Sequence, residues 1–240
     1  MEHRDRLWPG GYTFLYDDGL FRPSTDTFLL GSFPRLRRGM TVCELGAGTG
    51  LLSLLLLARE PELTVTGVEL QPQACALFRR TAEENSLQGR MHCLEGDLRQ
   101  GLLPPGRFRL AVANPPYFPP GAGAVAPDAA RRTARAETDC TLAQLCAAAA
   151  RALTWGGSFC LVHRPDRLAD VLEELRRVRL EPKRLRFVHH TAAARPSLFL
   201  LEARLGGGVG LTVEPPLLLH GPDGGETEDV RRAYFRDKEE

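Results

Sequence analysis

The stretch Glu44-Leu45-Gly46-Ala47-Gly48-Thr49-Gly50 joins a predicted strand over residues 41–45 to a predicted helix over residues 50–59. Glycines at alternate positions let the backbone turn tightly and approach a ligand. The dinucleotide fingerprint G-x-G-x-x-G has a different spacing, which seats a pyrophosphate on a helix N-terminus. Here the Glu44 carboxylate disfavours a pyrophosphate, whereas a ligand with a sulfonium and an ammonium group would tolerate it. The stretch therefore favours S-adenosylmethionine as cofactor, with a plain glycine-rich turn as the alternative.

Outward from this stretch, predicted strands and helices alternate along the chain. Thr141 and Gln144 form a capping box at the start of one helix, which we expect to reach Leu153 and to be terminated by Gly156-Gly157. Further helices are expected over residues 72–85 and 166–178. Further strands are expected over residues 63–69, 90–94, 108–113, 158–163, 183–189 and 197–204.

The last two predicted strands have no room for a helix between them, so they should pair antiparallel. The sequence thus predicts an α/β fold with a mostly parallel sheet of about seven strands and an antiparallel edge strand. N-terminal to this predicted sheet, alternating aromatic residues from Tyr12 to Tyr16 indicate a short strand or hairpin arm. We divide the chain into an N-terminal extension covering the cofactor site (1–40), a cofactor-binding catalytic domain (41–205) and a C-terminal tail (206–240).

Two acidic residues follow predicted strands where a cofactor would bind. Glu69 ends the second strand, about 20 residues beyond the glycines, where an acid accepts hydrogen bonds from ribose hydroxyls. Asp97 follows the third strand, and its carboxylate can accept the amino group of an adenine. The alternatives are a solvated strand-end carboxylate for Glu69 and a turn or helix-cap aspartate for Asp97.

The motif Asn114-Pro115-Pro116-Tyr117 follows the strand predicted over residues 108–113. The two prolines end the strand and stiffen the backbone, so an amide and an aromatic ring are presented at its carboxyl end, where open α/β sheets bind ligands. The Asn114 side-chain oxygen and the Pro115 carbonyl can accept hydrogen bonds from both N–H groups of a planar amino group, which exposes the nitrogen lone pair for methyl transfer. Tyr117 can stack on the planar substrate. The alternative is a proline-rich strand exit.

Composition excludes several other classes of protein. The 240 residues carry a net charge of +1, so there is no global nucleic-acid signature. No apolar run approaches the roughly 20 residues that span a bilayer, and the charged N-terminus lacks a signal core, so we expect a cytoplasmic protein with no membrane partner. The six cysteines form no C-x-x-C pair, and His163, His189 and His190 have no acid or cysteine at ligand spacing. No metal site is therefore expected.

One basic cluster lies close to the Asn-Pro-Pro-Tyr motif. Arg131, Arg132 and Arg135 fall in a predicted loop over residues 119–139, rich in glycine, alanine and proline. They are candidates for binding nucleic-acid phosphates, and a solvated charge run is an equal alternative.

The ordered motifs resemble those of class I S-adenosylmethionine-dependent methyltransferases of the N6-adenine type. Ser24-Thr25-Asp26-Thr27-Phe28-Leu29-Leu30, Val162-His163-Arg164-Pro165-Asp166-Arg167-Leu168 and Glu214-Pro215-Pro216-Leu217 further resemble the bacterial family that includes the tRNA adenine-N6 methyltransferase acting beside the anticodon of a valine tRNA. The resemblance implies a Rossmann-like methyltransferase sandwich, tRNA as partner, and residues 114–117 as the catalytic motif. It also implies that Thr25 and Asp26 lie near the methionine end of the cofactor. The cofactor contacts that it implies are Glu44, Gly46, Ala47, Gly48, Gly50, Glu69, Leu70, Asp97, Leu98 and Asn114.

Two other functions remain open from the sequence. A protein-glutamine methyltransferase acting on release factors would use the same motif on a side-chain amide, although the short N-terminal region leaves little room for the helical domain usual in those enzymes. A non-catalytic module that binds S-adenosylmethionine or nucleic acid is the second, and Asn114 and Tyr117 argue against it. The sequence gives no oligomeric state.

Overall fold

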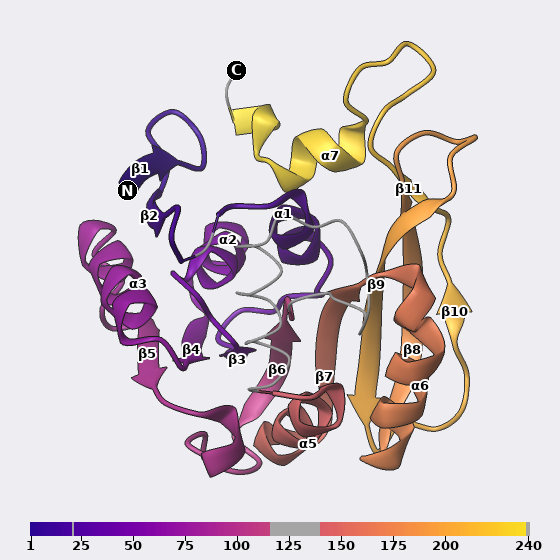
Figure 1. Cartoon of the computed structure of the whole chain (residues 1–240), viewed down its shortest axis with the longest axis horizontal. Coiled ribbons are helices and arrows are strands. Elements are labelled where there is room, and N and C mark those ends of the chain that lie inside the picture. Colours follow the sequence, from indigo (N-terminus) through magenta and orange to yellow (C-terminus); the bar gives the residue numbers. More distant parts are fainter. Residues whose placement is uncertain (21, 116–139, 239–240) are drawn as a thin grey trace.

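The computed structural model describes residues 1–20, 22–115 and 140–238. In them a nine-stranded sheet runs through the molecule (Figure 1). In chain order its strands are β3 (Thr41–Leu45), β4 (Thr64–Glu69), β5 (Met91–Glu95), β6 (Phe108–Ala113), β7 (Leu153–His163), β8 (Leu180–His189), β9 (Pro196–Leu205), β10 (Thr212–Val213) and β11 (Leu217–Leu218). They lie side by side in the order β10-β8-β9-β7-β6-β3-β4-β5, and β11 also pairs with β8.

Helices cover both faces of this sheet (Figure 1). Successive strand residues point to opposite faces, so Val42 of β3 belongs to one hydrophobic cluster and Cys43 to the other. The Val42 side is covered by α1 (Thr25–Ser32), α2 (Leu51–Arg59), α3 (Pro72–Glu84) and α7 (Glu228–Ala233). The Cys43 side is covered by α5 (Leu142–Ala152) and α6 (Leu168–Arg177). Short 3-10 turns are η1 (Leu98–Gln100), η2 (Pro165–Arg167) and η3 (Arg236–Lys238).

This three-layer arrangement confirms the predicted α/β fold, but the role predicted for Gly156-Gly157 is wrong. The capping box of Thr141 and Gln144 is present, but α5 ends at Ala152 and β7 runs on through the two glycines. A Cβ on Gly157 would lie 2.9 Å from the Thr154 carbonyl oxygen, and the pairing of β6 with β7 shifts register nearby. The glycines therefore permit an irregular stretch of sheet and do not end the helix.

The antiparallel strand lies inside the sheet and not at its edge as expected. β9 pairs antiparallel with β7 on one side and with β8 on the other. The segment after Gly206 then returns along β8 and adds β10 and β11 parallel to it. The C-terminal tail thus supplies strands that the alternation of strands and helices in the sequence did not indicate.

The N-terminal region and the tail bury side chains in the same core as residues 41–205. Strands β1 (Glu2–Arg6) and β2 (Thr13–Asp17) form an antiparallel hairpin that packs along α3, where the Leu15 backbone N–H donates to Thr81 Oγ1 at 3.2 Å. From the tail, the Tyr234 ring stacks on Phe28 of α1, with ring centroids 4.3 Å apart. Residues of all three segments therefore meet on the face of the sheet that carries α1 and α2 (Figure 1).

Candidate active site

The glycine-rich loop lies at the carboxyl end of β3, between β4 and β6. Gly46, Gly48 and Gly50 have φ angles of 74°, 52° and 86°, in the left-handed region that favours glycine. The backbone N–H groups of Gly46 and Ala47 both donate to the Val68 carbonyl, at 3.0 and 2.9 Å. A Cβ on Gly50 would lie 2.6 Å from the Phe78 ring, whereas a Cβ on Gly46 would meet no atom within 4 Å. The loop is therefore packed tightly against Phe78 at Gly50 and borders open space at Gly46.

Glu44 lies beneath this loop and faces α2. Its side chain is buried, and its Oε2 accepts hydrogen bonds from the Ser53 backbone N–H at 3.0 Å and from the Ser53 hydroxyl. Burial raises the pKa of the Glu44 carboxyl to about 8, against the two hydrogen bonds that lower it. Glu44 thus ties β3 to the first turn of α2, a role that the sequence did not indicate.

Glu69, at the end of β4, holds the same loop from the other side. Its Oε2 accepts from the Gly48 N–H at 2.8 Å, and its Oε1 accepts from the Gln71 N–H at 2.9 Å. Each carboxylate oxygen has a second lone pair, so Glu69 retains the capacity to accept ribose hydroxyls as well. The next residue, Leu70, is 46% exposed and places an apolar side chain at the same edge.

Asp97 caps the short turn η1. Its carboxylate accepts from the Arg99 backbone N–H at 2.8 Å and from Arg99 Nε at 2.9 Å, and these hydrogen bonds hold the pKa of Asp97 below its usual value. The geometry is that of a helix-cap aspartate, so an adenine amino group would share this carboxylate with Arg99. Beside it, Leu98 and Val68 line a cavity of about 240 Å³ between η1 and α5.

Asn114 follows β6 at the same edge of the sheet. Because β3 and β6 pair directly in parallel, Asn114 and the glycine loop lie at neighbouring strand ends. The Asn114 side-chain nitrogen donates to Thr27 Oγ1 of α1 at 2.9 Å, across 87 positions of sequence. In this contact the nitrogen end of the amide faces α1. In the sequence, Thr27 was distinguished only as a member of the segment Ser24 to Leu30 that carries part of the family resemblance.

The first turn of α1 also contains Thr25 and Asp26. Thr25 Oγ1 accepts from the Tyr234 hydroxyl at 3.0 Å, so the C-terminal tail reaches the residues expected near the methionine end of the cofactor. Asp26 lies in the first turn, where a negative side chain complements the helix dipole. The structure therefore brings Thr25, Thr27 and Asn114 together through one short helix.

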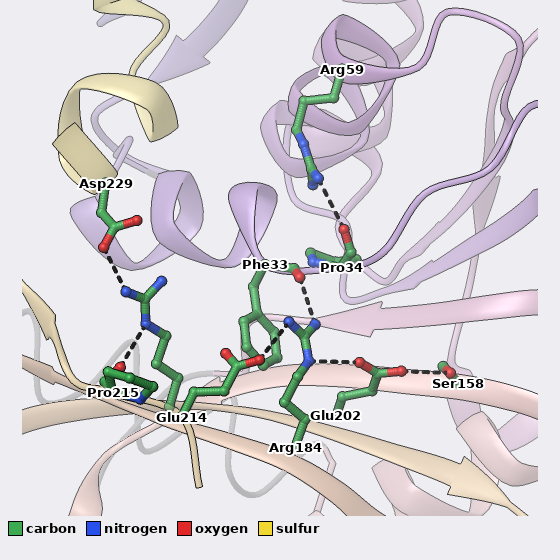
Figure 2. A network of polar contacts seen from close by, with 10 residues as sticks. Phe33, Pro34, Arg59, Ser158, Arg184, Glu202, Glu214, Pro215 and Asp229 are labelled. Atoms are coloured by element: carbon green, nitrogen blue, oxygen red, sulfur yellow. Dashed lines mark hydrogen bonds and ion pairs between the residues drawn. The ribbon is translucent and has the colours of Figure 1, made fainter. Parts of the chain in front are cut away.

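Two arginines hold the other end of α1, as Figure 2 shows. Arg59 of α2 donates to the carbonyls of Gly31 and Pro34, at 2.6 and 3.0 Å. Arg184 of β8 donates to the Phe33 carbonyl at 2.7 Å. The last carbonyls of a helix lack partners within it and carry partial negative charge, so guanidinium groups stabilise them. These arginines are further residues that sequence reasoning did not find.

Several predicted site residues lie outside the described part of the chain: Pro116, Tyr117, Arg131, Arg132 and Arg135. Within that part, His163 is buried and accepts from the Arg164 N–H at 2.8 Å, and burial lowers the pKa of its imidazole to about 4. The described residues contain no group of three histidine, cysteine or acidic side chains arranged to hold a metal ion. None of the described helices has the length and apolar character that crossing a membrane requires.

The chain is similar to known proteins in sequence and in fold. A family model described as the methyltransferase small domain matches residues 21–181. A tRNA1(Val) (adenine(37)-N6)-methyltransferase from Yersinia enterocolitica is 31% identical over 182 residues, which are 73% of this chain and 71% of that protein. An enzyme of the same name from Yersinia pestis is 32% identical over 160 residues, which are 64% of each chain and so slightly less than two thirds of that relative.

Solved structures show the same architecture. A predicted O-methyltransferase from Agrobacterium tumefaciens has a TM-score of 0.72 at 21% identity, covering 87% of this chain and 96% of that one. A geranyl diphosphate C-methyltransferase from Streptomyces coelicolor, in complex with S-adenosyl-L-homocysteine, has a TM-score of 0.54 at 14% identity, covering 74% and 75% of the two chains. At these identities the likeness shows the fold alone.

The fold and the matching family model define the class: this is a Rossmann-like methyltransferase. The chain belongs to the methyltransferase small domain family, and its methyl donor is S-adenosylmethionine. The residues present fit that donor, because the backbone at Gly46 borders open space and the carboxylate of Glu69 lies beside the loop with lone pairs to spare. When bound, this donor supplies an electrophilic methyl group on a sulfonium.

Proposed function

We propose that the chain methylates the N6 amino group of an adenine in tRNA. The observation that carries this proposal is the placement of Asn114, whose amide nitrogen is engaged by Thr27 at the carboxyl edge beside the glycine loop. An amide whose nitrogen is engaged in this way is suited to accept, through its oxygen, a hydrogen bond from an exocyclic amino group. The names of the Yersinia relatives, which specify an adenine of a tRNA, support the choice of acceptor.

In this mechanism the chain acts through position and charge more than through proton transfer. The amino nitrogen of adenine is a poor nucleophile because its lone pair is delocalised into the ring. When Asn114 Oδ1 and the Pro115 carbonyl accept hydrogen bonds from its two N–H groups, the nitrogen becomes more pyramidal and its lone pair points toward the methyl donor. After the methyl group is transferred, the nitrogen loses one of these protons to solvent. Preorganised acceptors of this kind lower the barrier because they need no rearrangement during the reaction. Tyr117 would stack on the adenine ring.

The test is transfer of labelled methyl from S-adenosylmethionine to total tRNA, total DNA and purified release factor, followed by nucleoside and amino-acid analysis. We expect label in tRNA as N6-methyladenosine. Label in glutamine of the release factor would replace this proposal with the protein-glutamine reaction. Absence of methyl transfer and of S-adenosylmethionine binding by calorimetry would overturn both.

In the same assay we expect Asn114→Ala to abolish methyl transfer while binding S-adenosylmethionine nearly as well as the wild type. The reason is that the Asn114 amide oxygen is assigned to the acceptor nitrogen, so the cofactor contact that the family resemblance implies for Asn114 should add little to the affinity for S-adenosylmethionine. If the variant lost methyl transfer and S-adenosylmethionine binding to the same degree, Asn114 would be a cofactor ligand instead of a catalytic residue.

A further inference from the structure

The geometry points to Thr27 as the positioning residue that sets the rotation of the Asn114 amide. This inference rests on the proposed role of Asn114 and goes beyond it. The Asn114 nitrogen lies 2.9 Å from Thr27 Oγ1, and the Thr27 side chain is only 2% exposed. Thr27 Oγ1 accepts from this nitrogen, and with its own proton directed to Ser24 Oγ, 3.2 Å away, the hydroxyl offers the amide only lone pairs. It then favours the nitrogen end, because an amide nitrogen can only donate and an amide oxygen can only accept.

The rotation of this amide decides whether its oxygen or its nitrogen faces the amino group that is to be methylated. The oxygen can accept a hydrogen bond from an amino group, whereas the amide nitrogen in its place would set two donors against each other. The two ends have nearly the same shape, so packing alone distinguishes them poorly. A partner that engages the nitrogen supplies the distinction. Thr27 is therefore assigned to Asn114 and not to the substrate or the cofactor, which it does not need to touch.

The Thr27 hydroxyl is itself held in place. Ser24 Oγ lies 3.2 Å from Thr27 Oγ1, within hydrogen-bonding distance. The helix that carries Thr27 packs closely on α2, where a Cβ on Gly31 would lie 2.9 Å from the Leu55 side chain. The same helix is anchored at its C-terminal end by Arg59 and Arg184 (Figure 2). The position of the hydroxyl is thus fixed by the core and not by a loop.

The test compares Thr27→Val with Thr27→Ser. Valine keeps the shape of the side chain and removes the hydroxyl, so we expect kcat to fall about tenfold, the effect of one lost hydrogen bond. Serine keeps the hydroxyl, so we expect its kcat to lie within about twofold of the wild type. The affinity for S-adenosylmethionine should stay unchanged in both. A valine variant with wild-type kcat, or one in which kcat and cofactor affinity fall together, would overturn the assignment.

Thr81→Val is the matched control. Thr81 of α3 is also buried, and its hydroxyl accepts from the Leu15 N–H of β2 and not from Asn114. This variant should lose stability to a similar degree and keep the wild-type kcat. If it lowered kcat as much as Thr27→Val does, general destabilisation would explain both effects and the assignment would be wrong.

A second readout needs no methyl transfer and so separates this inference from the proposed function. The side-chain amide signals of Asn114 in a ¹⁵N-edited spectrum are identified by their loss in Asn114→Ala. In Thr27→Val we expect these signals to shift and their protons to exchange faster with water, and in Thr27→Ser to stay near the wild-type values. Unchanged signals in the valine variant would overturn the inference even if the enzyme methylates tRNA. Shifted signals would support it even if the acceptor is another molecule.

Discussion

Arg184 donates to the backbone carbonyl of Phe33 at 2.7 Å, although the two residues are 151 positions apart in the sequence. The same guanidinium pairs with Glu202 at 2.9 Å and with Glu214 at 3.3 Å, and it lies over the Phe33 ring, 3.9 Å from the centroid. One side chain of β8 therefore joins β9, the C-terminal tail and the end of α1 (Figure 2). The C-terminal end of α1, the helix that carries Thr27, is therefore held by a residue distant from it in the sequence, and that residue is in turn paired with Glu214 of the C-terminal tail.

We expect Arg184→Met to lower the free energy of unfolding by about 3 kcal/mol, because it removes the cationic partner of two mostly buried carboxylates and the donor to the Phe33 carbonyl. Urea unfolding at neutral pH measures this loss. Arg176→Met is the matched control: Arg176 pairs with Glu181 at 2.8 Å but is 60% exposed, so its loss should be below about 1 kcal/mol. Equal losses in the two variants would show that the Arg184 contacts add nothing beyond a surface ion pair.

The parts of this molecule that sequence reasoning found are those governed by local pattern. The glycine loop, the parallel strands and the capping box of Thr141 each follow from spacing within a few residues, and the structure confirms these elements. The contacts of Thr27 with Asn114 and of Arg184 with Phe33 join residues 87 and 151 positions apart, and no local pattern encodes them.

Gly156-Gly157 shows a different limit. Two adjacent glycines are typical of a helix end, and they are also typical of irregular pairing in a sheet. Only the close approach of the β6 backbone, with a Cβ on Gly157 placed 3.2 Å from the Phe108 carbonyl oxygen, distinguishes the two here. Asp97 is similar, because the sequence could not tell a cap held by Arg99 from an adenine acceptor.

Glu44→Gln should make stability less dependent on pH. The unfolded carboxyl ionises near 4.5, whereas the folded one ionises near 8, so between these values the folded state binds more protons than the unfolded state. The wild-type free energy of unfolding therefore falls as pH rises through this window, by at most about 1.4 kcal/mol per pH unit, and levels off above it. Glutamine does not titrate and can still accept from Ser53.

The measurement is urea unfolding of both proteins, without cofactor, at about pH 5, 6.5 and 8. We expect the variant to gain stability relative to the wild type as pH rises, with the largest gain at the highest pH. Parallel curves for the two proteins would show that the Glu44 carboxyl titrates normally in the folded state.

Asp97→Ala tests whether the aspartate does more than cap η1. Loss of the cap alone should reduce stability by about 1 kcal/mol and leave the cofactor affinity unchanged. We expect calorimetry to show weaker binding of S-adenosylmethionine as well, because we assign the same carboxylate to the adenine amino group. Wild-type affinity in a folded Asp97→Ala variant would move adenine recognition to other residues and leave Asp97 as a cap.

Gly46→Ala and Gly39→Ala form a matched pair that locates the cofactor. Both glycines have a left-handed backbone, with φ of 74° and 70°, and a Cβ on either would meet no atom within 4 Å. The strain of an alanine in that region should therefore lower stability by a similar amount in each, about 1 kcal/mol. Only Gly46 borders the space assigned to S-adenosylmethionine, so we expect only Gly46→Ala to weaken cofactor binding, by at least about tenfold. Calorimetry and thermal unfolding of the two variants measure both quantities. Equal cofactor affinity in the two variants would place the donor away from the glycine loop, since the added methyl group at Gly46 has no other atom to displace.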